Sequence, residues 1–213
     1  MKRSVVLAIL ALALARPAHA DDSEDARLRA RLGADLAPPV IAIVHESAAQ
    51  GLPTATLVAR ALEGVSRQAD SGAILAAVQR QASGLAAARR VLGLAAGDAE
   101  IEAGAGALLA GVPEDSLASL KRARPTGSLV IPLVVLSDFV ARGVPAANAS
   151  STVLAAARAG APDPALLRMR ERINERIQRG ERPLGASREG LRELLARTSP
   201  DRKGGAPRRG SRP

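Results

Sequence analysis

His45 is the residue whose type and surroundings come closest to a known catalytic pattern. It opens the segment HESAAQ (45–50), whose first two residues match the start of the zinc-protease helix His-Glu-x-x-His. In that pattern two histidines one turn apart bind the metal, but position 49 of this chain is alanine. The chain also has no cysteine, so the several nitrogen or sulfur ligands of a zinc site are missing. We therefore predict neither a catalytic nor a metal-binding role for His45.

Carboxylates gather in GDAEIEAG (97–104), where Asp98 and Glu102 would share one face of a helix. Oxygen ligands of this kind suit a hard cation. Acidic residues are also favoured in the first turn of a helix, because that end of the helix dipole is positive. The second interpretation needs no ligand, and we adopt it. Asp138, four residues before Arg142, similarly has the spacing of a helical ion pair rather than a sign of acid–base catalysis.

Other patterns of chemistry are absent from the sequence. There is no G-x-S-x-G, S-x-x-K or P-loop motif. Gly104 and Gly106 lack the third glycine of a dinucleotide-binding loop, because position 109 is leucine. The sequence therefore predicts no catalytic residue, no metal site and no cofactor.

The most organised polar feature lies in residues 166–180. Leu166, Met169, Ile173 and Ile177 recur at helical spacing and predict a buried stripe. Arginines line one flank of the stripe with glutamates beside them, which is typical of a solvent-exposed charged face but also of a surface for an anionic partner. With the basic residues near the C-terminus, the candidate anion-binding residues are Arg168, Arg172, Arg176, Arg179, Arg202, Lys203, Arg208, Arg209 and Arg212.

The C-terminal segment SPDRKGGAPRRGSRP (199–213) has no apolar residue larger than alanine and proline. It cannot bury enough surface to offset the entropy of ordering, so we predict a disordered basic tail. This segment has a net charge of +4, against +2 for residues 21–198. The net positive charge of the mature chain is therefore mostly a property of the tail. It does not imply a specific nucleic-acid-binding surface on the fold.

The opening segment MKRSVVLAILALALARPAHA (1–20) has the three parts of a secretory signal peptide. Lys2 and Arg3 precede an apolar stretch at 4–15, and Ala18-His19-Ala20 matches a cleavage site. The apolar stretch is too short for the roughly 20 residues that span a bilayer. We predict cleavage after Ala20, a periplasmic or secreted mature chain and no transmembrane segment after signal removal.

The mature chain must be stabilised by packing, because it has neither disulfides nor a large aromatic core. Phe139 is its only aromatic residue, and Ala, Leu, Val and Ile must fill the interior. These residues recur at three-to-four spacing almost throughout, which predicts helices. We expect helices over 24–32, 39–50, 53–63, 71–92, 98–110, 113–124, 131–142, 145–159, 163–179 and 187–198.

Gly-x-Pro triplets at 51–53, 111–113, 143–145 and 160–162 fall between these helices. A glycine can close a helix in the left-handed conformation, and a proline shortly after it can occupy the first position of the next helix. We therefore interpret the triplets as helix junctions. Units starting at 51, 111 and 143 each contain a junction, a helix, a turn and a helix, which suggests degenerate αα-hairpin repeats. The alternative is chance similarity from a composition rich in alanine and leucine.

The apolar run LVIPLVVL (129–136) is the one segment that resembles a buried strand. Pro132 in its middle argues against a central strand, since proline cannot donate to a sheet. A helix that starts near Ile131 keeps Pro132 in its first turn, and Ser128 then precedes the helix rather than capping it. Because the run is apolar on every side, we expect the innermost helix of the fold.

Together these patterns predict an all-α fold: an array or irregular bundle of about nine to ten short antiparallel helices. Residues 21–198 would form a single domain between a signal peptide (1–20) and a tail (199–213). Two functions remain. The first is an exported, non-enzymatic interaction or scaffold protein of the cell envelope. The alternative is a binder of anionic envelope polymers or lipid headgroups through the arginines and the tail.

Overall fold

The structure of the chain, a computed structural model, describes residues 18–198 and the side chains of residues 23–198. Most of the predicted signal peptide (1–17) and the predicted tail (199–213) lie outside the described residues. The described part contains helices and no β-strand, which confirms the all-α prediction. Its nine helices are α1 (Ala18–Ala49), α2 (Ala55–Ser66), α3 (Ser71–Leu92), α4 (Asp98–Leu109), α5 (Glu114–Ala123), α6 (Val130–Ala141), α7 (Ala146–Arg158), α8 (Asp163–Gln178) and α9 (Pro183–Thr198).

Helix α1 consists of two arms that meet at Gly33. This glycine has φ 74° and ψ 179°, outside the helical range, and it ends the first arm as predicted. The start of the second arm was predicted wrongly. Pro38 and Pro39 lie inside the helix instead of opening it, because helical residues already follow Gly33 directly. Proline is tolerated best in the first turn of a helix, and Pro38 and Pro39 lie at the end of the first turn of the second arm.

Helices α3 and α6 begin and end within one residue of their predicted boundaries. Helix α3 begins after Asp70, whose carboxylate accepts a hydrogen bond from the backbone N–H of Ala73 at 2.9 Å, and it ends before Gly93. Helix α6 has Pro132 in its first turn, and Leu129 rather than Ser128 is the N-cap residue. The strand-like run 129–136 is therefore helical, as expected. Leu133, Val135, Leu136 and Phe139 are fully buried in it or nearly so.

The Gly-x-Pro triplets are helix junctions, and each glycine closes the preceding helix in the same way. At 143–145, Gly143 has φ 86°, and the N–H of Val144 donates to the carbonyl of Phe139 at 2.9 Å, which closes α6 in a Schellman motif. Val144 is 1 % exposed, so the middle residue of the triplet also anchors the turn in the core. The proline then serves as N-cap residue, one position earlier than predicted. At the other three triplets, the residue after the glycine donates the equivalent backbone N–H bond to a carbonyl of the preceding helix. These residues are Leu52, Val112 and Ala161.

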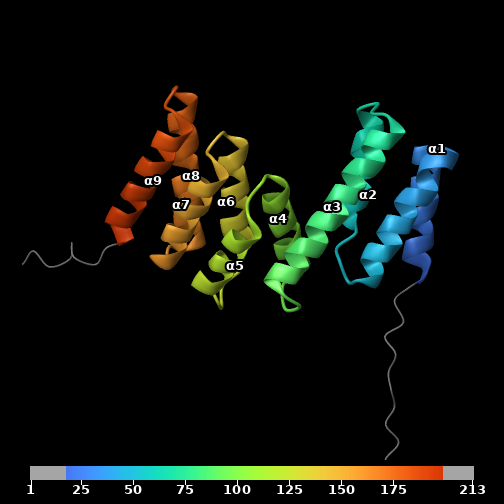
Figure 1. Ribbon diagram of the computed structural model, residues 1–213, viewed down its shortest axis with the longest axis horizontal. Helices are drawn as coiled ribbons and strands as arrows, with labels where there is room; N and C mark the ends of the chain where they lie inside the picture. Colours follow the sequence, from blue (N-terminus) through green and yellow to red (C-terminus); the bar gives the residue numbers. More distant parts are fainter. Residues whose placement is uncertain (1–17, 199–213) are drawn as a thin grey trace, which may run out of the picture.

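The helices form a two-layered array along the longest axis of the molecule, from α1 at the right of Figure 1 to α9 at the left. One layer consists of the second arm of α1 followed by α3, α5, α7 and α9, each packed on the next, and α4, α6 and α8 form the facing layer. The substantial packing connects helices that are adjacent or next but one in sequence. The hairpin units that the sequence suggested at 111 and 143 correspond to α5–α6 and α7–α8, and neither pair has substantial packing between its two helices. Helix α5 packs instead on α3 and α7, and α7 packs on α5, α6 and α9.

One apolar core runs through the array from Leu28 to Leu194. Small residues let neighbouring helices approach closely. A Cβ on Gly104 of α4 would lie 3.0 Å from Leu92 and 3.1 Å from Ala88 of α3, and a Cβ on Gly190 of α9 would lie 2.5 Å from Ile173 of α8.

No helix in the described part of the chain is both long and apolar enough to cross a membrane.

Candidate functional site

The arginines of α8 do not form one free surface, because α9 engages two of them. Glu193 of α9 lies between Arg172 and Arg176: it forms an ion pair with Arg172 Nε at 3.7 Å and a hydrogen bond with Arg176 Nη2. Arg176 also pairs with Glu181 at 3.3 Å, in the segment between the two helices. The hydrogen bond to Glu193 raises the pKa of the Arg176 guanidinium above its usual value, and the bond to Glu181 acts in the same direction. Arg176 therefore contributes to the α8–α9 interface.

The other predicted anion-binding residues divide into two groups. Arg168 on α8 and Arg179, the C-cap residue of the same helix, are exposed. The Nε of Arg179 donates to the backbone carbonyl of Glu175 at 3.3 Å. The five basic residues of the tail, Arg202, Lys203, Arg208, Arg209 and Arg212, lie outside the described residues.

A pocket of about 220 Å³ lies where the first half of α8 faces the last turn of α9. Arg168 and Arg172 line it from α8, and Arg197 and Thr198 line it from α9. Sequence analysis missed Arg197. The antiparallel pairing of α8 with α9, which the Arg172–Glu193 ion pair reflects, brings the end of α9 beside Arg168. The sequence predicts both helices, at 163–179 and 187–198, but it does not show that they pack against each other.

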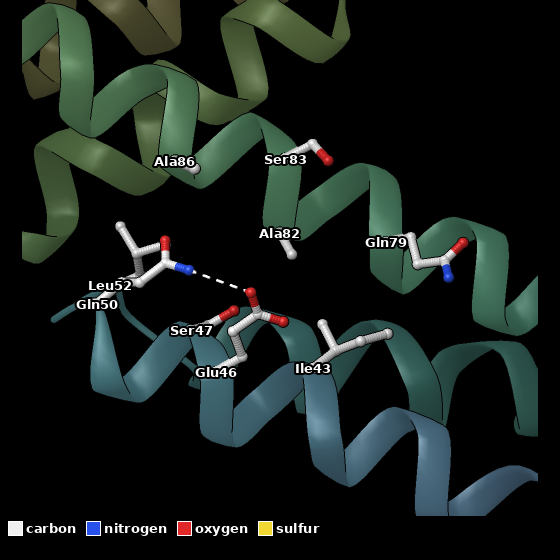
Figure 2. Close-up of a pocket in the computed structure, with 9 residues that line it drawn as sticks. All are labelled: Ile43, Glu46, Ser47, Gln50, Leu52, Gln79, Ala82, Ser83 and Ala86. Atoms are coloured by element: carbon white, nitrogen blue, oxygen red, sulfur yellow. Dashed lines mark hydrogen bonds between the residues drawn. The ribbon is translucent and has the colours of Figure 1, made fainter.

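A second pocket, of about 320 Å³, forms a groove between the second arm of α1 and α3 (Figure 2). The apolar part consists of Ile43, Leu52, Ala82 and Ala86. The polar part consists of Glu46, Ser47, Gln50, Gln79 and Ser83, and Gln50 donates a long hydrogen bond of 3.5 Å to Glu46. This surface combines small side chains with several amide and hydroxyl groups, and sequence analysis gave no sign of it.

His45 joins the two arms of α1. Its Nε2 lies 3.0 Å from Oδ1 of Asp25, and Asp25 Oδ2 also accepts a hydrogen bond from Arg29 at 3.2 Å. Asp25 is 8 % exposed, so these two partners satisfy a carboxylate that is almost buried. This arrangement gives His45 a structural contact across the kink at Gly33.

Two acidic residues, Glu100 and Asp138, make contacts between helices. Glu100 accepts a hydrogen bond at 2.8 Å from the backbone N–H of Leu129, the N-cap residue of α6. Asp138 pairs with Arg142 at 3.1 Å, as predicted, and also accepts a hydrogen bond from Asn174 of α8 at 3.1 Å. Among the side chains of residues 23–198, no group of three or more histidine or acidic residues is arranged to hold a metal ion.

No protein-family model, no curated protein and no solved structure matches the chain. The function must therefore be argued from the geometry of the molecule.

Proposed function

We propose that the mature chain is an exported, non-enzymatic scaffold that binds another protein of the cell envelope. The observation that carries this proposal is the two-layered helical array, in which α1 and α3 leave a groove between them. Arrays of this kind expose long surfaces to a partner, because each helix is covered mainly by its neighbours in the row. Export is supported by the signal-peptide pattern at 1–20.

The groove between α1 and α3 suits an extended peptide segment of the partner. Ala82, Ser83 and Ala86 are small enough for a main chain to approach α3 closely. The amides of Gln50 and Gln79 can both donate to and accept from a peptide backbone. Glu46 is the only charged residue that lines the groove, which favours a neutral or basic segment over an acidic one.

A pull-down from the envelope fraction tests this proposal. The bait is the mature chain, with Ser83→Arg as the variant, because Ser83 is exposed in the middle of α3 and lines the groove. A long cationic side chain there should fill the groove and abolish capture of the partner. The matched control is Ser151→Arg, a change at an exposed serine in the middle of α7, which should leave capture intact. Equal capture by the unmodified chain and both variants would reject the groove as the docking site.

The second candidate function is binding of anionic envelope polymers or lipid headgroups. It is favoured by the exposed Arg168 and Arg197, which meet at one pocket, and by the charge of the tail. Salt separates the two candidates: polyanion binding weakens steeply as the salt concentration rises, whereas binding in a largely uncharged groove does not.

A further inference from the structure

We propose that the pocket between α8 and α9 is a binding site for a single phosphate monoester group. The inference rests on the second candidate function and makes it specific: one phosphoryl group in a defined pocket, rather than diffuse attraction to a row of arginines. The phosphoryl group can belong to free phosphate, to a small phosphate ester or to a lipid headgroup.

Three arginine side chains line one pocket. Arg168, Arg172 and Arg197 come from two different helices and line a space of about 220 Å³. Guanidinium groups present several N–H donors in a planar fork, which matches the oxygens of a phosphate. The residues that line the pocket include no carboxylate. The charged groups that line the pocket are therefore all cationic.

Arg172 of this pocket has an unsatisfied hydrogen-bond donor. Its Nε is buried and makes no hydrogen bond within the described part of the chain. A carboxylate oxygen of Glu193 lies 3.7 Å from this Nε, beyond hydrogen-bond distance, and Glu193 is hydrogen-bonded to Arg176 instead. A buried donor without an acceptor is costly, and an anion in the pocket would provide oxygens to the same guanidinium group.

Charge and shape distinguish the ligand classes. Glu193 lies beside one of the three arginines of the pocket, Arg172, and it is shared with Arg176, which leaves an excess of positive charge at the pocket. A phosphate monoester has a charge of about −1.5 to −2 at neutral pH and balances this excess better than a carboxylate does. Pro162, Ala165 and Leu194 provide an apolar wall beside the arginines. An ester with an apolar substituent should therefore bind more tightly than inorganic phosphate.

Isothermal titration of the full mature chain tests the site, with inorganic phosphate, phenyl phosphate and acetate as ligands. We expect saturable binding of one phosphate per chain, tighter binding of phenyl phosphate and no saturable binding of acetate. Arg168→Gln and Arg197→Gln should each weaken phosphate binding by about tenfold or more, since each removes charge-assisted hydrogen bonds. Arg172→Lys keeps the charge but removes the fork, and it should also weaken binding by about tenfold.

Two matched controls separate a pocket from diffuse attraction. Arg188→Gln removes one exposed charge from α9 outside the pocket and should leave phosphate binding unchanged. The double change Arg208→Gln and Arg209→Gln reduces the charge of the tail and should weaken binding to polyphosphate while leaving phosphate binding unchanged. Thermal melting of every variant identifies any that fail to fold, and Arg168 and Arg197 are exposed enough to be replaced without loss of the fold.

Vesicles distinguish the sources of the phosphoryl group. Phosphatidylcholine vesicles with and without phosphatidic acid show whether a lipid monoester is bound, and competition by phenyl phosphate shows whether the pocket binds it. Absence of saturable phosphate binding, or equal weakening by Arg188→Gln and Arg197→Gln, would overturn the proposed pocket. Polyphosphate binding that persists in the pocket variants would leave the second candidate function standing, so the two ideas can fail separately.

Discussion

At the scale of single residues, two glycines of this chain have opposite roles. Gly190 of α9 lies against Ile173 of α8, and a methyl group at this position would approach the Ile173 side chain to 2.5 Å. Gly106 of α4 is exposed, and a methyl group there would meet no atom within 4 Å. The first glycine is required by packing between helices, whereas the second only loosens its own helix.

The two glycines therefore predict opposite effects of the same substitution. Gly190→Ala should lower the free energy of unfolding by about 1–3 kcal/mol, because Ile173 is buried and cannot move aside freely. Gly106→Ala should raise the free energy of unfolding by about 0.5–1 kcal/mol, because alanine restricts the unfolded chain. Urea denaturation of the two variants measures both effects. Similar losses from both substitutions would contradict the close approach of α8 and α9.

Sequence analysis predicted the local partners of residues better than the distant ones. The Asp70 cap and the Asp138–Arg142 pair were predicted because both partners lie within one turn of a helix. The bond from Glu100 to the N-cap of α6 and the pairing of His45 with Asp25 were not predicted. These contacts depend on the packing of helices, which periodicity does not specify. Arg197 was missed for the same reason.

At the scale of helices, α6 was predicted to be innermost, and its side chains are sharply divided by burial. Leu133 is fully buried, whereas its neighbour Val134 is 38 % exposed. Leu133→Ala should therefore lower the free energy of unfolding by about 2–5 kcal/mol, and Val134→Ala by less than about 1 kcal/mol. Chemical denaturation compares the two directly. A small effect of Leu133→Ala would mean that α6 is not part of the core.

The limits of helix prediction in this chain are physical. The ends of α3 and α6 were predicted closely, because Asp70, Gly93 and Pro132 act through the backbone of their own helix. The second arm of α1 was predicted to begin at the prolines, because proline is common in the first turn. In the folded chain Gly33 ends the first arm, and the second arm begins directly after it.

At the scale of the whole molecule, the neighbour-to-neighbour packing predicts uneven local stability. Helices α1 and α9 each have partners on one side of the array only, whereas α4 and α6 are packed on both sides. Amide hydrogen exchange should therefore be slowest in α4 and α6 and faster in α1 and α9. Uniform protection along the chain would indicate that the array unfolds as one unit.

The predicted tail and most of the predicted signal peptide lie outside the described residues, so the two ends of the chain need a separate test. Exported protein should begin at Asp21, which N-terminal sequencing establishes. Deletion of residues 199–213 should leave Tm nearly unchanged and weaken binding to anionic vesicles at low salt, because the segment has charge but little to bury. A Tm that falls by several degrees would show that the tail packs on the fold.

Packing between near neighbours also determines how the molecule would respond to tension. A force applied at α1 and α9 has to pass through successive helix interfaces in series, since the substantial contacts join helices adjacent or next but one in sequence. Small changes at each interface would add up, so the array would lengthen as an elastic spring before any helix unfolds. Pulling single molecules by the two ends would record this as a gradual extension that precedes the first abrupt step.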